Sequence, residues 1–242
     1  TWEEVVGDTV PALTVRNFNR KIERSALAMG EYSNIKNAFP LLSLLLLQGG
    51  SSLVTESQNQ YKILINQSVS NSAATPFANA ATFFTNFSNT QNTLYSWNRS
   101  LTLDRDMFLS EDLALYFGFA SEGKELEAKN PNLSFDVAEV PQGQTATVKR
   151  TYGTYYGLVV PKAAKNKTGS FGVMQKIGNQ ENAKLLADGY QMAPVHRATL
   201  LGGSNDIYGR IAYTSANYAR GWLSPDLEKL DTVFTTMLDD IN

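Results

Sequence analysis

Apolar residues recur every three or four positions along several stretches of this 242-residue chain, which is the spacing of one face of an α-helix. Residues 35–47 are apolar on nearly every face, so we expect that helix to be buried all round. Gly49 and Gly50 follow it and favour a helix end there. The spacing predicts helices over residues 2–13, 35–47, 76–87, 103–109, 122–129, 171–177, 182–187, 206–218 and 227–241.

Residues that favour helix starts stand in front of three of these segments. Thr75 precedes Pro76, and this order suits an N-cap followed by the first helical position. Ser121 is expected to cap residues 122–129. Ser224-Pro225-Asp226 predicts the start of the last helix.

Three shorter runs have the character of strands, namely Leu113–Phe119, Phe135–Val140 and Tyr152–Val160. Pro141 and Pro161 end the last two. Helices outnumber these separated strands, which favours an α/β or α+β fold. Residues 51–73 are rich in Ser, Asn and Gln, so we expect an exposed excursion there.

The amino-acid composition indicates a folded globular protein and gives little information about its binding partners. Hydrophobic residues make up 43% and charged residues 18%, so the chain can bury a core and disorder throughout is excluded. A length of 242 residues predicts one large domain or two small ones. Lys and Arg total 21 against 23 Asp and Glu, and this even balance gives no reason to expect nucleic acid or an anionic membrane surface.

Several kinds of chemistry are excluded by residues that the sequence lacks. It has no Cys and one His, which excludes thiol catalysis, Cys-based metal sites and multi-His metal sites. Glycine-rich phosphate motifs are absent as well. We therefore expect no metal and no cofactor. The most apolar stretch, Phe39–Leu47, is about half the roughly 20 residues of a membrane-spanning helix.

Two short patterns in the sequence are compatible with a hydrolase. Gly203-Ser204-Asn205-Asp206 resembles one block of an esterase family, but the rest of that pattern is absent and a loop followed by a helix cap is the simpler interpretation. A carboxylate pair such as Asp104 and Glu122 could serve a glycoside hydrolase. The carboxylates lie among other charged residues, which is more typical of a solvated surface.

Aromatic residues at strand ends and strand–helix junctions are the most informative group. Phe119 ends a predicted strand, Tyr152, Tyr155 and Tyr156 lie along the next, and Trp222 stands just before the last helix. Such junctions often line the ligand site of an α/β fold. Aromatic rings suit sugars, whose C–H faces stack while hydroxyls take hydrogen bonds. Periodicity alone fits core aromatics as well.

The order of several short motifs resembles that of the family 1 extracellular solute-binding proteins, the sugar-capturing subunits of ABC importers. The similarity runs from Thr1 to Ile241. It is carried by Thr1-Trp2-Glu3-Glu4, the apolar run ending in Gln48-Gly49-Gly50, Phe108–Glu122, Asn130–Val137 with Val140-Pro141, Tyr152–Pro161, Pro194–Arg197, and Ala219-Arg220-Gly221-Trp222 before Ser224-Pro225-Asp226.

The resemblance implies a type II periplasmic-binding-protein fold, in which two α/β lobes are joined at a hinge with the ligand between them. It also implies a fragment that lacks most of the N-terminal lobe. Residues 1–170 would then be mainly the second lobe. Residues 171–213 would return toward the first lobe, and residues 214–242 would form a hinge-proximal turn and the final helix.

The function implied is non-catalytic capture of a sugar or similar small polar solute outside the cytoplasm, in the periplasm or on a cell-surface lipoprotein. The implied protein is a monomer whose protein partners are ABC permease subunits. Its only attachment to a membrane would be an N-terminal anchor in the missing part. Two alternatives remain, a carbohydrate-active hydrolase with an acid pair and a surface adhesin that retains the fold.

The ligand contacts that the resemblance implies fall on eight residues. The turn containing Phe119 carries Ala120 where maltose-binding relatives have Trp, so stacking falls to Phe119. Arg197 would meet the ligand or pair with an acid. The full implied set is Trp222, Phe119, Tyr152, Tyr155, Ser121, Asn34, Tyr32 and Arg197.

Overall fold

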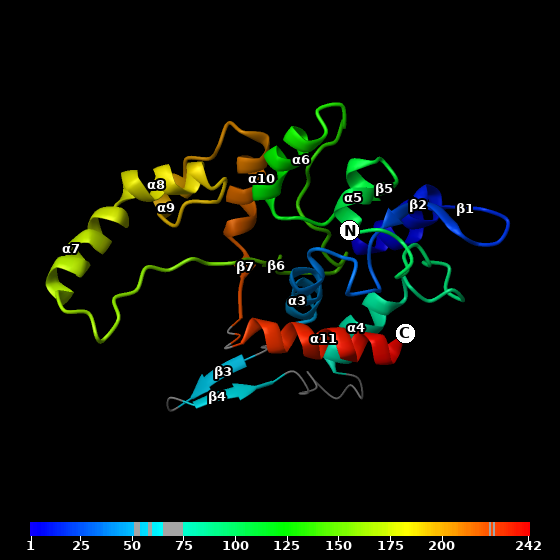
Figure 1. Ribbon diagram of the computed structural model, residues 1–242, viewed down its shortest axis with the longest axis horizontal. Helices are drawn as coiled ribbons and strands as arrows, with labels where there is room; N and C mark the ends of the chain where they lie inside the picture. The colour runs from blue at the N-terminus through cyan, green and yellow to red at the C-terminus, as the bar shows by residue number, and fades with distance from the viewer. Residues whose placement is uncertain (51–53, 58–59, 65–74, 223, 225) are drawn as a thin grey trace. The chain divides into compact units, whose positions relative to one another are not determined.

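The computed structural model is a mixed α/β fold that divides into two compact units (Figure 1). It describes residues 1–50, 54–57, 60–64, 75–222, 224 and 226–242. Unit 1 comprises Thr1–Gly118, Val140–Tyr152 and Arg220–Asn242, and unit 2 comprises Phe119–Glu139 and Gly153–Ala219. The chain therefore crosses between the units four times.

The first helical segment of unit 1 confirms the helix predicted over residues 2–13. It consists of α1 (Trp2–Glu4), the π-helical turn η1 (Val5–Thr9) and α2 (Val10–Leu13). Thr1 caps it, because its Oγ1 accepts a hydrogen bond from the Glu4 N–H at 3.3 Å. The Glu4 carboxylate binds the terminal amine in return, which completes a capping box.

A three-stranded sheet follows in unit 1, made of β1 (Val15–Arg16), β2 (Ile22–Leu27) and β5 (Leu113–Leu115). Strands β1 and β2 are antiparallel, and β2 pairs with β5 in parallel. The register sets Ser25 opposite Leu113 and Leu27 opposite Leu115. The predicted strand 113–119 is thus confirmed only in its first three residues.

Helix α3 (Ala38–Gln48) lies in the core of unit 1 and buries most of its residues, as its all-round apolar pattern predicts. Gly49 ends it. Strands β3 (Val54–Ser57) and β4 (Gln60–Ile63) form an antiparallel pair within the stretch predicted as an excursion. Residues 51–53, 58–59 and 65–73 of that predicted stretch lie outside the described residues.

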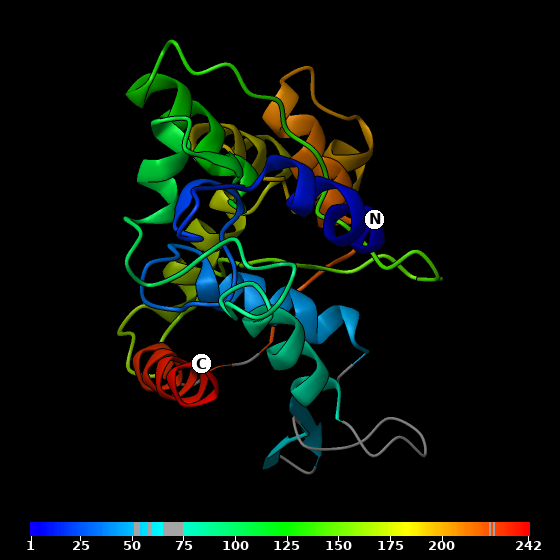
Figure 2. The same cartoon turned by 90° about the vertical axis from the view of Figure 1, so that its right-hand side faces the viewer.

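Three further helices complete unit 1: α4 (Pro76–Thr85), α5 (Asp104–Leu109) and α11 (Leu227–Ile241). The predicted caps are confirmed, since Thr75 accepts from the Ala78 N–H and Asp226 accepts from the Lys229 N–H, both at 3.1 Å. Helix α11 lies beside α4 (Figures 1 and 2). No helix in the described part of the chain has the length and apolar character needed to cross a bilayer.

Unit 2 is mainly helical. Its elements are η2 (Ala120–Glu122), α6 (Gly123–Lys129), α7 (Lys167–Ile177), α8 (Gln180–Gly189), α9 (Arg197–Leu201) and α10 (Ile207–Ala216). Tyr208 connects α10 to α6 and to the segment that follows α6. Its hydroxyl donates a hydrogen bond to Glu127 of α6 at 2.7 Å, and its ring centroid lies 6.3 Å from that of Phe135. Burial first, and then the hydrogen bond to Glu127, raise the pKa of the Tyr208 phenol.

Two strand predictions and one cap prediction were wrong. Residues 135–140 form no strand, and only Tyr152 of the run 152–160 belongs to a strand, β6 (Thr151–Tyr152). Both runs have strand-forming composition, but a strand also needs a neighbouring backbone to bond. Ser121 lies inside η2 and Phe119 takes the N-cap position. Helix α9 was missed because five residues are too few for a periodic signal.

Candidate ligand-binding residues

Five aromatic rings of unit 1 form an aromatic cluster around Phe39 of α3. The Phe39 ring centroid lies 5.8 Å from that of Tyr152, 5.6 Å from that of Trp222 and 5.9 Å from that of Phe234. Phe77 of α4 contacts Phe234 at 6.3 Å. Two residues proposed from the sequence, Tyr152 and Trp222, are therefore brought to one place by a ring that the sequence reasoning did not select.

Trp222 is held in this cluster by a hydrogen bond as well as by ring contacts. Its Nε1 donates to Oγ of the fully buried Ser43 at 3.0 Å. The ring lies 6.4 Å from Phe234 at 48°. The side chain is half-buried, so part of its surface faces solvent. Its indole N–H is used internally, which leaves stacking as the contact that this residue can offer a ligand.

Tyr32 is buried and bonds to the last helix. Its hydroxyl donates to Oδ1 of Asp231 at 2.6 Å, and its ring lies 6.5 Å from that of Phe234. Burial first, and then the contact with Asp231, raise the pKa of this phenol above its ordinary range. Tyr32 therefore anchors α11 to the loop before α3, and this role explains its position in the structure.

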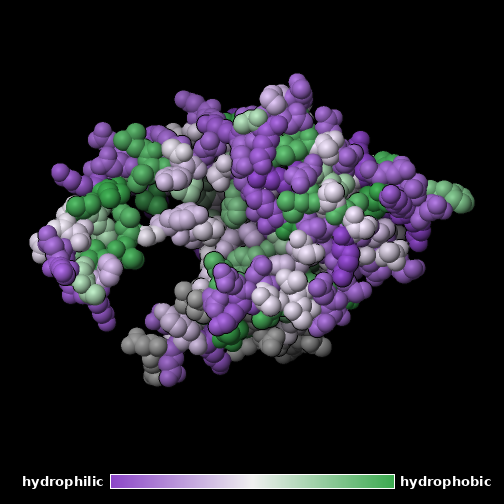
Figure 3. All heavy atoms as spheres, in the orientation of Figure 1, coloured by the Kyte–Doolittle hydropathy of each residue, from purple (hydrophilic) through white to green (hydrophobic). Residues whose placement is uncertain are grey.

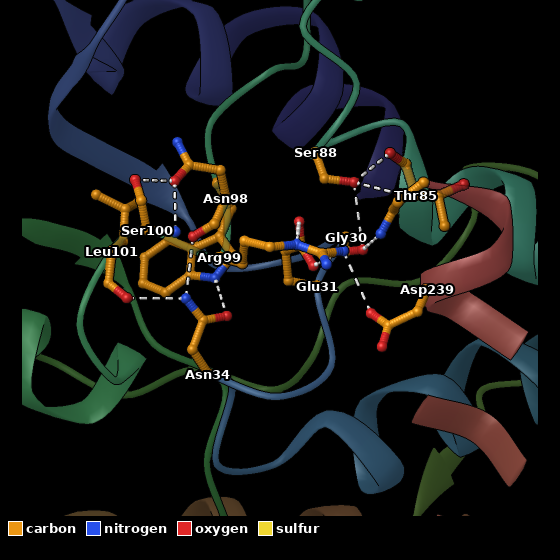
Figure 4. Close-up of polar contacts among 12 residues, drawn as sticks. Gly30, Glu31, Asn34, Thr85, Ser88, Asn98, Arg99, Ser100, Leu101 and Asp239 are labelled. Carbon is orange, nitrogen blue, oxygen red and sulfur yellow. Dashed lines mark hydrogen bonds and ion pairs between the residues drawn. The ribbon is translucent and has the colours of Figure 1, made fainter. Parts of the chain in front are cut away.

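Asn34 lies in a network of polar contacts shown in Figure 4. Its Oδ1 accepts from Nε1 of Trp97 at 2.9 Å. Its Nδ2 donates to the carbonyl oxygens of Asn98 and Leu101, both at 3.0 Å. Trp97 is fully buried, so the Asn34 amide satisfies a donor that has no access to water.

Replacing Asn34 with alanine is expected to lower the free energy of unfolding by about 2–3 kcal/mol, because it leaves the Trp97 N–H and two carbonyls without this partner. Urea unfolding followed by tryptophan fluorescence measures the effect. Asn19→Ala is the control, since Asn19 is exposed. Equal stability of the two variants would contradict the structural role assigned to Asn34.

The same view shows how the C-terminal end of α11 is fixed (Figure 4). Arg99 Nη2 lies 3.1 Å from Oε2 of the buried Glu31 and 3.2 Å from Oδ1 of Asp239. Asn242 Nδ2 donates to the Gly30 carbonyl at 2.7 Å. These contacts and the Tyr32–Asp231 bond hold α11 at both ends, so the aromatic cluster has a defined position within unit 1.

The other four proposed residues belong to unit 2. The Phe119 N–H donates to Oε1 of Glu122 at 3.2 Å, and its carbonyl accepts from the Glu122 N–H at 2.8 Å. This pair of bonds fixes the turn that contains Ser121, and both Phe119 and Ser121 are half-buried. The hydroxyl of the exposed Tyr155 donates to the Ala219 carbonyl at 2.8 Å. Arg197 begins α9 and is exposed.

The two carboxylates considered for hydrolysis have structural partners. Asp104 is 1% exposed, and its Oδ1 accepts from the N–H groups of Lys36 at 2.9 Å and Arg105 at 2.8 Å. Glu122 is buried and caps the turn at Phe119. Among the residues that the structure describes, no cluster of three or more His, Cys, Asp or Glu is placed to hold a metal ion.

The half-buried rings, the exposed phenol of Tyr155 and the exposed cation of Arg197 are groups that bind polar organic molecules by stacking and hydrogen bonding. Comparisons with models of protein families, with curated proteins and with solved structures found no match for this chain.

Proposed function

We propose that this chain belongs to an extracytoplasmic solute-binding protein with a type II periplasmic-binding-protein fold. It captures a sugar or a similar small polar solute without chemical change and delivers it to an ABC importer. Aromatic stacking and hydrogen bonds hold the solute. This proposal joins the motif resemblance of the sequence to two properties of the described units.

The observation that carries the proposal is where the aromatic residues lie along the chain. The chain passes from one unit to the other at Gly118–Phe119, at Tyr152–Gly153 and at Ala219–Arg220, as well as at Glu139–Val140. Phe119 and Tyr152 stand at two of these crossings, and Trp222 follows a third by two residues. Receptors that close by a hinge motion hold ligands near their connecting segments.

The sparse core of unit 2 supports the same proposal. Helix α7 buries no side chain and α8 buries only Ala187. Their exposed apolar residues include Phe171, Val173, Leu185 and Leu186, and hydrophobic surface gathers over these helices in Figure 3. An apolar surface of this kind ordinarily packs against other polypeptide. The resemblance implies such a partner for residues 171–213, namely the remainder of the first lobe.

The hydrogen bonds and the burial of the two candidate carboxylates favour binding over hydrolysis. Asp104 and Glu122 both accept hydrogen bonds from backbone N–H groups and are buried. A general acid needs a proton to donate and a base needs a free lone pair toward the substrate. Backbone bonds at these oxygens serve turn and helix geometry instead.

The direct test is a thermal-shift screen of the complete protein against sugars, polyols and short peptides. A ligand at about a hundred times its Kd stabilises the folded state by roughly 2.7 kcal/mol, which shifts the midpoint of unfolding measurably. A shift with one class of solute is expected. If no compound shifts the midpoint, capture of these solutes is refuted and the adhesin alternative gains weight.

A variant pair tests the role of Trp222 in binding. Trp222→Ala is expected to weaken the affinity for the solute identified by the screen by about tenfold or more, because a stacked ring is worth about 1.4 kcal/mol or more. Phe77→Ala is the matched control, since Phe77 contacts the same Phe234 but is not a proposed ligand contact. Titration calorimetry measures both. Equal losses would show that Trp222 acts only through the aromatic cluster.

A further inference from the structure

The loop that joins β1 to β2 presents a fully exposed aromatic ring. Phe18 has a relative exposure of 101%, the highest among the exposed large apolar residues described. The hairpin projects from the body of unit 1 (Figure 1). A phenyl ring has no polar group to satisfy in water, so complete exposure costs hydrophobic free energy that contact with an apolar phase would recover.

The turn around Phe18 is well bonded. The Asn17 Oδ1 accepts from the N–H groups of Asn19 and Lys21, both at 3.0 Å, and the Asn17 N–H donates to the Lys21 carbonyl at 2.9 Å. Arg20 adopts a left-handed conformation with φ of 61° and donates its N–H to the Asn17 carbonyl at 2.9 Å. These bonds define the turn, so Phe18 is displayed by a formed structure.

The base of the hairpin is fixed to unit 1. The Arg16 guanidinium donates to the Tyr95 carbonyl and lies 5.7 Å from the centroid of the Tyr95 ring. Burial lowers the pKa of this guanidinium. Arg16 also pairs with Ile22 across the two strands. Its charge therefore serves the base of the hairpin, and the tip extends from an anchored stem.

Two exposed cations, Arg20 and Lys21, lie in the turn with Phe18, and a third, Arg24, lies on β2 opposite Val15. None of them takes part in the ion pairs found among the described residues. Glu23 is the one acid between residues 15 and 24. Further acids, Glu111 and Asp112, lie toward the root, where the Asp112 carbonyl accepts from the Ser25 N–H at 2.8 Å. The turn of residues 17–21 thus carries two cations, Arg20 and Lys21, and no acid.

We propose that this hairpin tip, residues 17–21, binds an anionic lipid surface, with the Phe18 ring entering the interfacial region and Arg20 and Lys21 facing lipid phosphates. Charge complementarity argues for this partner, because two cations without ion pairs beside a ring that has no polar group suit a phosphate layer above hydrocarbon. The even charge balance of the whole chain hides this local excess. The inference goes beyond solute capture and does not depend on it.

The test is co-sedimentation with vesicles of equal parts phosphatidylglycerol and phosphatidylcholine, compared with vesicles of phosphatidylcholine alone. We expect binding to the anionic vesicles that weakens as salt screens the charges. Phe18→Ala is expected to lower the partition coefficient about tenfold. Arg20→Gln with Lys21→Gln is expected to lower it roughly thirtyfold, from the usual contribution of two basic residues near an anionic surface.

The control removes two positive charges elsewhere. Lys162→Gln with Lys165→Gln changes the net charge equally, and both lysines are exposed in unit 2. This variant is expected to bind as the wild type does. Because all substituted side chains are exposed, thermal midpoints close to the wild-type value will verify folding of each variant.

Three results would overturn the proposal. Binding to phosphatidylcholine alone that equals binding to the anionic vesicles would exclude the charge contribution. Full binding by Phe18→Ala would exclude insertion of the ring and leave surface electrostatics only. No binding to anionic vesicles would remove the lipid surface as partner, and an acidic protein groove would then be the remaining chemistry for this tip.

Discussion

Replacing Phe234 with alanine is expected to lower the free energy of unfolding by about 3–5 kcal/mol, the usual cost of removing a buried aromatic side chain. Phe234 is 2% exposed and contacts the rings of Tyr32, Phe39, Phe77 and Trp222. Its loss would leave a cavity where α11 meets α3 and α4. Urea unfolding followed by tryptophan fluorescence provides the measurement.

Val233→Ala is the matched control for this effect. Val233 is the preceding residue of the same helix and is 58% exposed, so its truncation should change stability by no more than about 0.5 kcal/mol. The pair thus separates burial from any effect on the helix itself. A loss below about 1 kcal/mol for Phe234→Ala would show that the aromatic cluster does not hold α11 in solution.

Replacing Gly30 with alanine is expected to cost about 3–5 kcal/mol of unfolding free energy, from backbone strain and steric overlap together. Gly30 has φ of 105°, which side-chain-bearing residues rarely adopt. A Cβ atom there would lie 2.5 Å from the Ser88 backbone nitrogen. The Gly30 carbonyl also accepts hydrogen bonds from Ser88 Oγ and Asn242 Nδ2, so a shift of this loop would loosen the end of α11.

Gly50→Ala separates the two causes. Gly50 also has a positive φ, of 83°, but a Cβ atom there would meet no atom of the described residues within 4 Å. Only the strain of the left-handed conformation applies, and it costs about 1–2 kcal/mol. We expect the Gly30 variant to unfold at a clearly lower urea concentration than the Gly50 variant. Coincident midpoints would mean that contact with Ser88 adds nothing.

Part of the candidate site could be predicted from the sequence, because the residue type and its place at the junction of two elements are local properties. Trp222 and Tyr152 were selected as aromatic residues at element junctions, and both lie in the aromatic cluster. Phe39 and Phe234, which join them, were read only as apolar helical positions. Nothing in the sequence separates a ring that touches another element from one that fills its own helix face, since that depends on how helices pack.

Asn34 and Tyr32 also show that the sequence does not reveal which partners a side chain has in the folded chain. Both were proposed as ligand contacts from the motif resemblance. In the structure the Asn34 amide bonds to residues of the 97–101 loop and the Tyr32 hydroxyl bonds to Asp231, which is 199 positions later in the chain. A polar side chain has few hydrogen-bonding groups, and only the folded chain decides which partners use them.

The sequence by itself determined most of the helices and their ends, because side-chain spacing and capping act within a few residues. Thr75 and Asp226 cap α4 and α11 where their residue types predict. Only the tertiary structure decided which extended runs became strands, since residues 152–160 have strand-forming side chains but largely lack strand pairing. It also decided how Phe18 is displayed, because pairing of β1 with β2 leaves this ring in an exposed turn, whereas the four cations of residues 16–24 are already neighbours in the sequence.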